Sequence, residues 1–69
     1  MKLSARNMIK GTVKSVDLGV VNAEVVVEVA PGVEITAMIT KQSCLDLELE
    51  EGKQARVVIK ASNVMVGTG

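Results

Sequence analysis

The sequence predicts an all-β fold with one short helix, and three observations support this prediction. Hydrophobic residues make up 48% of the 69 residues, yet Phe, Tyr and Trp are absent, so the core must come mainly from Val, Ile, Leu, Ala and Met. Branched side chains of this kind favour strands. Polar and apolar residues also alternate over several segments, and these segments are separated by glycine- or proline-containing turns.

Three strands are predicted in the first forty residues. The first covers residues 9–16, where Gly11 marks a bend or a bulge, and a turn follows it. The second, residues 23–29, is dense in valine, and its odd-numbered residues are all apolar, so that face should be buried. Residues 30–32 (Ala-Pro-Gly) break this strand with a turn, and the alternating residues 33–39 complete a hairpin.

One short helix and two further strands are expected after the hairpin. Thr40 is a suitable N-cap, and apolar residues within 44–49 fall at the spacing of a short amphipathic helix that Gly52 should end. Residues 54–60 and 63–66 have the pattern of strands. Five strands, with the helix between the third and the fourth, fit a small five-stranded OB-like Greek-key barrel. A five-stranded open sheet is the main alternative.

The chain is predicted to be a single domain, residues 1–69, that assembles as a homo-oligomer. A domain this small buries only about 60% of the surface of its unfolded chain, so it commonly depends on disulfides, a metal or oligomerisation. Cys44 is the only cysteine and histidine is absent, which excludes an internal disulfide and a structural zinc site. Several copies are therefore expected to share a core or an interface.

Composition argues against nucleic-acid binding, catalysis and membrane insertion. Eight basic and eight acidic side chains balance, and no aromatic platform is available for stacking bases. Cys44 has no imidazole to activate it and is interpreted as a buried hydrophobe, while the acidic residues 46–51 are interpreted as a solvated face. No apolar run approaches the roughly 20 residues that span a bilayer, and no signal peptide is recognisable. We therefore expect a cytoplasmic protein that is not an enzyme.

Three polar segments carry donors suited to a tetrahedral oxyanion. Residues 4–7 precede the first strand, residues 40–43 open the helix, and residues 60–62 link the last two strands. Hydroxyl groups, free backbone N–H groups, and cations such as Arg6 and Lys60 are the donors that such an anion requires. Ordinary caps, turns and surface charges explain the same residues, so spacing alone leaves both an oxyanion site and a purely structural oligomerisation domain open.

The same segments resemble the Mop domain found in molbindins. The resemblance covers roughly residues 3–67, and Met8 is a mild departure because the family commonly has a polar residue near this position. It rests on the order and spacing of Ser4-Ala5-Arg6-Asn7, Asn22-Ala23-Glu24-Val25, Ile39-Thr40, Glu51-Gly52-Lys53 and Ile59-Lys60-Ala61-Ser62-Asn63-Val64-Met65-Val66.

The resemblance implies a protein that binds molybdate or tungstate reversibly at subunit interfaces and performs no chemistry on them. It implies an OB-like barrel and a hexamer made of three dimers. Related domains occur in molybdate-responsive regulators and in transporter ATPases. Because no DNA-binding or ATPase segment accompanies this chain, intracellular storage and homeostasis of molybdenum are expected. Direct binding of a pterin is not expected, since no aromatic side chain is present to stack on its ring.

The resemblance also implies two kinds of oxyanion site. In the first, Arg6 and Lys60 neutralise the charge, and no side chain is a direct metal ligand; its residues are Ser4, Arg6, Thr40, Ser43, Lys60, Ala61 and Ser62. The second lies near a symmetry axis and is built largely from backbone amides. Our candidate for it is the loop that includes Gly19, Val20, Asn22 and Ala23. An OB-type nucleic-acid-binding module and a structural oligomerisation domain are the alternatives.

Overall fold

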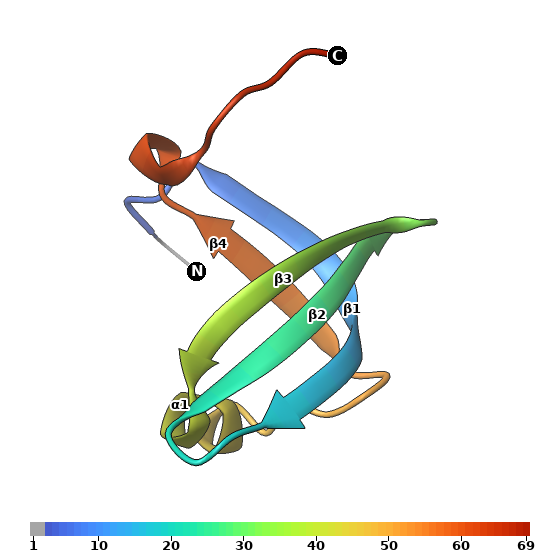
Figure 1. Ribbon diagram of the computed structural model, residues 1–69, viewed down its shortest axis with the longest axis vertical. Coiled ribbons are helices and arrows are strands. Elements are labelled where there is room, and N and C mark those ends of the chain that lie inside the picture. Colours follow the sequence, from blue (N-terminus) through green and yellow to red (C-terminus); the bar gives the residue numbers. More distant parts are fainter. Residues whose placement is uncertain (1–2) are drawn as a thin grey trace.

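The computed structural model describes residues 3–69 as a curved antiparallel sheet with one short helix, so Met1 and Lys2 of the predicted domain lie outside the described residues. The strands lie in the order β3-β2-β1-β4 (Figure 1). Mostly β structure with one short helix was therefore a correct prediction. In chain order the elements are β1 (Asn7–Leu18), β2 (Asn22–Ala30), β3 (Val33–Thr40), α1 (Lys41–Asp46), β4 (Gln54–Ile59) and the 3₁₀ turn η1 (Ala61–Asn63).

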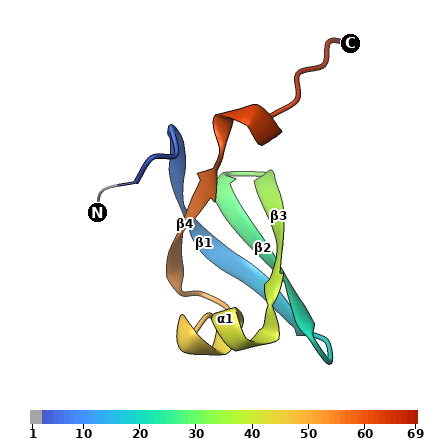
Figure 2. The ribbon, with the colours of Figure 1, turned by 90° about the vertical axis from the view of Figure 1, so that its left-hand side faces the viewer.

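The long strand β1 pairs with two different strands along its length. Its first half, Asn7 to Thr12, pairs with β4, and its second half, Thr12 to Leu18, pairs with β2. The register with β2 shifts between Val13 and Ser15, which marks a bulge and bends the strand. The sheet curves accordingly, with β4 and β3 as its two edges, and α1 covers one end of the curve (Figure 2).

Gly11 lies where β1 passes from one partner strand to the other. A Cβ atom at this position would lie 2.6 Å from the carbonyl oxygen of Glu28 and 2.6 Å from Cγ1 of Val27. Both distances are far shorter than ordinary van der Waals contact, and one of the atoms belongs to the backbone. Close approach of β1 to β2, and not only the bend predicted from the sequence, therefore requires glycine here.

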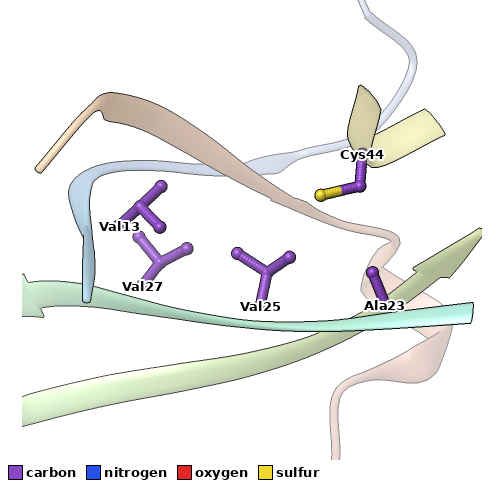
Figure 3. Packing of buried hydrophobic residues seen from close by; sticks show 5 residues of the cluster. All are labelled: Val13, Ala23, Val25, Val27 and Cys44. Carbon is purple, nitrogen blue, oxygen red and sulfur yellow. The ribbon is translucent and has the colours of Figure 1, made fainter. Parts of the chain in front are cut away.

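Among the residues that the structure describes, five small side chains form the buried core (Figure 3). The odd-numbered residues of β2 from 23 to 29 were predicted to be buried; those from 23 to 27 are, whereas Val29 is only partly buried. Cys44 points toward the buried residues from α1. Cys44 is 2% exposed, which confirms that this cysteine is buried. The complete set is Val13, Ala23, Val25, Val27 and Cys44, and partly buried residues such as Ile39 and Val57 pack against it.

The helix begins as predicted but ends earlier. Thr40 is the N-cap, and α1 stops at Asp46, six residues before the glycine that was expected to end it. Glu48 adopts a left-handed backbone conformation with φ 54°, and the ammonium of Lys53 donates to the carbonyl oxygens of Leu47 and Glu48 at 2.8 and 3.0 Å. A lysine that binds the exposed carbonyls at a helix end stabilises this early termination.

The predicted fifth strand at residues 63–66 is absent from the described chain, and the sheet does not close into a barrel. Asn63 belongs to η1, which turns the chain away from the sheet, and residues 64–69 extend outward without a strand partner (Figure 1). The alternation of Val64, Met65 and Val66 is typical of a strand, but alternation does not supply the backbone partner that a strand needs. Met65 and Val66 are 93% and 91% exposed.

An open groove of about 710 Å³ is lined by residues of all four strands and of the segment between α1 and β4. Its walls are mainly apolar and include Val25, Val27, Ala37, Ile39 and Val57. Within residues 3–69, α1 and η1 are both far shorter than the roughly 20 apolar residues of a membrane-spanning helix.

We predict that Gly11→Ala lowers the free energy of unfolding by about 1–3 kcal/mol, since the added methyl group would overpack the contact between β1 and β2. Denaturant unfolding at a fixed protein concentration measures this change. Gly67→Ala is the control, because a Cβ atom at Gly67 meets nothing within 4 Å. Equal stabilities of the two variants would contradict the steric role of Gly11.

Candidate functional site

Five of the seven residues predicted to bind an oxyanion lie at one end of the sheet. The ladder between β1 and β4 ends with the pair Asn7 and Ile59. Residues 4–6 therefore enter β1 beside the point where residues 60–62 leave β4, and both segments lie at the η1 end of the molecule (Figures 1 and 2). The structure thus brings together Ser4, Arg6, Lys60, Ala61 and Ser62, all of which are exposed.

The charged side chains of these two segments, Arg6 and Lys60, are both positive and form no ion pair with the described residues. Within residues 3–69 the recorded ion pair joins Lys14 and Glu28 at 4.0 Å, and it involves neither Arg6 nor Lys60. Neither of the segments 4–6 and 60–62 contains a carboxylate. Two cations are therefore available to an anionic ligand, and the guanidinium of Arg6 presents its donors in a planar fork.

Thr40, the N-cap of α1, and Ser43, in the first turn of α1, lie at the opposite end of β1. The Thr40 hydroxyl oxygen accepts a hydrogen bond from the Ser43 backbone N–H at 3.0 Å, and the same hydroxyl donates to the Ser43 hydroxyl oxygen at 2.8 Å. The N–H of Lys41 donates to the carbonyl of Val21 at 2.7 Å. The Thr40 hydroxyl, the Ser43 N–H and the Lys41 N–H are therefore already used in bonds within the chain. The Ser43 hydroxyl is an acceptor in its bond with Thr40, so its own hydrogen remains available to another partner.

The residues predicted to form a second site lie next to this helix start. Asn22 pairs with Thr40 across β2 and β3, and the N–H of Gly19 donates to the carbonyl of Asn22 at 2.8 Å, which closes the turn. Ala23 is fully buried in the core, while Val20 is 93% exposed at the tip of the turn. The turn is therefore tight, and the Gly19 amide is committed to it.

Within one chain, the predicted first site is divided into two groups. The group containing Arg6 and Lys60 lies where β1 begins, and the group containing Thr40 and Ser43 lies near the place where β1 ends. None of these residues lines the apolar groove. Sequence spacing gave no sign of this division, because it does not show at which end of the sheet a loop emerges.

One residue to which sequence reasoning gave no role makes a contact at the first group. The side-chain amide nitrogen of Asn7 donates to the carbonyl oxygen of Ile59 at 3.2 Å, and the bond is partly buried. The sequence feature that could have identified Asn7 was its place in the polar segment 4–7. Among residues 3–69, no cluster of three or more Cys, Asp or Glu side chains is arranged to hold a metal ion.

Comparison with known proteins identifies close relatives of the whole chain. Molybdenum-pterin-binding protein 3 of Clostridium pasteurianum is 46% identical over 66 residues, which cover 96% of this chain and 97% of that protein. A molybdate-binding protein of Sporomusa ovata has a solved structure that matches with a TM-score of 0.91 and 37% identity, covering 99% of this chain and 100% of that one.

A third relative was solved with its ligand. The cytoplasmic molybdate-binding protein ModG, with molybdate bound, matches with a TM-score of 0.93 and 49% identity; the match covers all of this chain and 49% of the ModG chain. The model of the TOBE domain matches residues 3–66. The chain therefore belongs to the TOBE domain family, among the molybdenum-pterin-binding (Mop) proteins to which the molbindin resemblance pointed.

Proposed function

We propose that this protein binds molybdate reversibly between copies of itself and serves the storage and homeostasis of molybdenum in the cytoplasm. The observation that carries the proposal is the division of the polar residues between the two ends of the sheet in each copy. A site that uses both groups is complete only where one end of a copy meets the other end of its neighbour. Relatives named for molybdate binding support the choice of anion.

The charge of the ligand fits the first group. Molybdate and tungstate are tetrahedral dianions, and Arg6 and Lys60 supply two positive charges that lack ion pairs within residues 3–69. Ser4, Ser62 and the backbone at Ala61 would add donors from the same copy, and Thr40 and Ser43 would add donors from the neighbour. Anions prefer such convergent donors, because charge-assisted hydrogen bonds are shorter and stronger than neutral ones. The turn at Gly19, Val20, Asn22 and Ala23 would hold a second anion near a symmetry axis, through backbone amides other than that of Gly19, which the turn itself uses.

Assembly would also complete the fold of each domain. Residues 1–69 form one Mop domain in this proposal, and the exposed apolar residues 64–66 of one copy would pair with an open sheet edge of another. The apolar groove that all four strands line is the matching surface. Addition of that strand would close a five-stranded barrel and remove an exposed edge. The assembly we propose is a hexamer made of three dimers.

A bare oxyanion suits these residues better than the other ligands considered. A pterin ring or a nucleic-acid base would stack on aromatic side chains, and the sequence has none. Binding without chemistry is proposed because no imidazole is present and the single thiol is buried. The one observation that favours a purely structural oligomerisation domain is the bond between the Thr40 and Ser43 hydroxyls, which is typical of an ordinary helix cap.

Calorimetric titration of the anion-free protein tests the proposal. Molybdate should saturate at or above one anion per chain, and sulfate and phosphate at the same ionic strength should give little heat. Lys60→Ala and Arg6→Ala should each weaken molybdate binding about tenfold to a hundredfold, the usual effect of losing a hydrogen bond to a charged group. Lys14→Ala is the control, since this exposed lysine is paired with Glu28 away from both groups. The absence of saturation by molybdate would refute the proposal.

Thr40→Asp distinguishes the role of Thr40 as the N-cap of α1 from its proposed contact with the anion. Aspartate is a good N-cap, so the unfolding midpoint should change little, whereas its negative charge should weaken molybdate binding by at least about tenfold if Thr40 touches the anion. Thr36→Asp places the same charge at an exposed position on β3 and should leave the affinity unchanged. Unchanged affinity of the Thr40 variant would favour the purely structural role.

Met65→Asp should weaken assembly, because a carboxylate would have to be buried between copies. Sedimentation equilibrium should then show a smaller average mass than for the unaltered protein at the same concentration. Thr68→Asp adds the same charge three residues further along the chain and should assemble normally. Unaltered mass of the Met65 variant would show that the segment 64–66 lies outside the interface.

A further inference from the structure

The pair that ends the ladder between β1 and β4 carries a side-chain bond in addition to its backbone pairing. Asn7 and Ile59 are register partners, and the side-chain amide nitrogen of Asn7 donates to the carbonyl oxygen of Ile59 at 3.2 Å. The bond joins residues 52 positions apart in the sequence. Asn7 is partly buried, so the bond is shielded to some extent from competing water.

The acceptor of this bond belongs to the peptide group that leads directly into Lys60. The carbonyl carbon of Ile59 is covalently bonded to the nitrogen of Lys60, so holding the carbonyl oxygen restrains the orientation of that whole planar peptide group. The donor residue follows Arg6 immediately in the chain. One hydrogen bond therefore links the residue next to Arg6 with the backbone next to Lys60.

We infer that Asn7 is a positioning residue, which fixes Arg6 and the segment 60–62 relative to each other without itself touching the anion. The inference rests on the proposed function, which supplies the ligand, molybdate. The positioning role itself rests on the hydrogen bond from Asn7 to Ile59. Restrained donors bind an anion more tightly than mobile ones, because less conformational entropy is lost on binding. Loss of the bond should therefore lower affinity more than it lowers stability.

The same ladder offers a matched control at its other end. There Thr12 and Gln54 are register partners, and the Gln54 side-chain amide donates to the Thr12 hydroxyl oxygen at 3.0 Å. Thr12 and Asn7 are both partly buried on β1, and the bond between Gln54 and Thr12 is the more exposed of the two. Asn7→Leu and Thr12→Val each replace a polar side chain by an apolar one of similar shape, and each removes one cross-strand side-chain bond of the same ladder.

The test compares the two variants with the unaltered protein in three measurements. Light scattering verifies that all three assemble alike, and denaturant unfolding should show similar, small changes for both variants. Calorimetry should show that Asn7→Leu weakens molybdate binding about fivefold to tenfold, the equivalent of one net hydrogen bond, while Thr12→Val binds as the unaltered protein does. Equal affinities of the two variants would overturn the positioning role.

A second readout does not depend on the anion. In nuclear magnetic resonance spectra of the anion-free protein, Asn7→Leu should shift the backbone amide signals of Lys60, Ala61 and Ser62 and speed their hydrogen exchange, whereas Thr12→Val should leave them in place. Undisturbed signals at these residues would refute the inference. If the unaltered protein fails to bind molybdate, the proposed function fails, and these spectra still decide whether Asn7 holds the segment.

Discussion

The pairing of β1 with two strands is the interaction on which the rest of the structure depends. Its first half holds β4 and its second half holds β2, and the change of partner occurs beside Gly11, where the backbones approach too closely for a side chain. This arrangement places the start of the chain beside the end of β4. It also carries the turn after β1 to the start of α1, so a single strand determines where both groups of candidate residues lie.

The small core explains why a chain of this kind is expected to depend on its neighbours. Five of the residues from 3 to 69 are buried, none of these five is aromatic, and the largest of them are valines. Burial of a valine contributes about 1.5–3 kcal/mol at most, which leaves little margin over the conformational entropy of the chain. In contrast to these buried residues, apolar side chains such as Val20, Met65 and Val66 are almost fully exposed. Met65 and Val66 belong to the segment that the proposed assembly would bury.

The sequence predicted the elements that local patterns specify. The buried face of β2, the Thr40 cap and the buried Cys44 all follow from periodicity and residue type, and they agree with the structure. The end of α1 was predicted too late in the sequence. The helix ends early because Lys53, distant in sequence from the helix start, binds the carbonyl oxygens of Leu47 and Glu48. The prediction of a strand at residues 63–66 was wrong, because alternating residue types describe the side chains of a segment and do not show whether another strand is available to pair with it. Likewise, residue types suggested an oxyanion site, but only the register of the ladder shows which of its members lie together.

The pair of Asn7 and Ile59 is the last rung of its ladder, and this position has a consequence for the speed of exchange. Terminal rungs open more often than central ones, since local opening there disrupts few other contacts. A ligand held by groups attached to such a rung would leave whenever the end of the ladder opens, without unfolding of the core. For the proposed role in molybdenum storage, this arrangement would allow the anion to be released at the end of the ladder while the core stays folded.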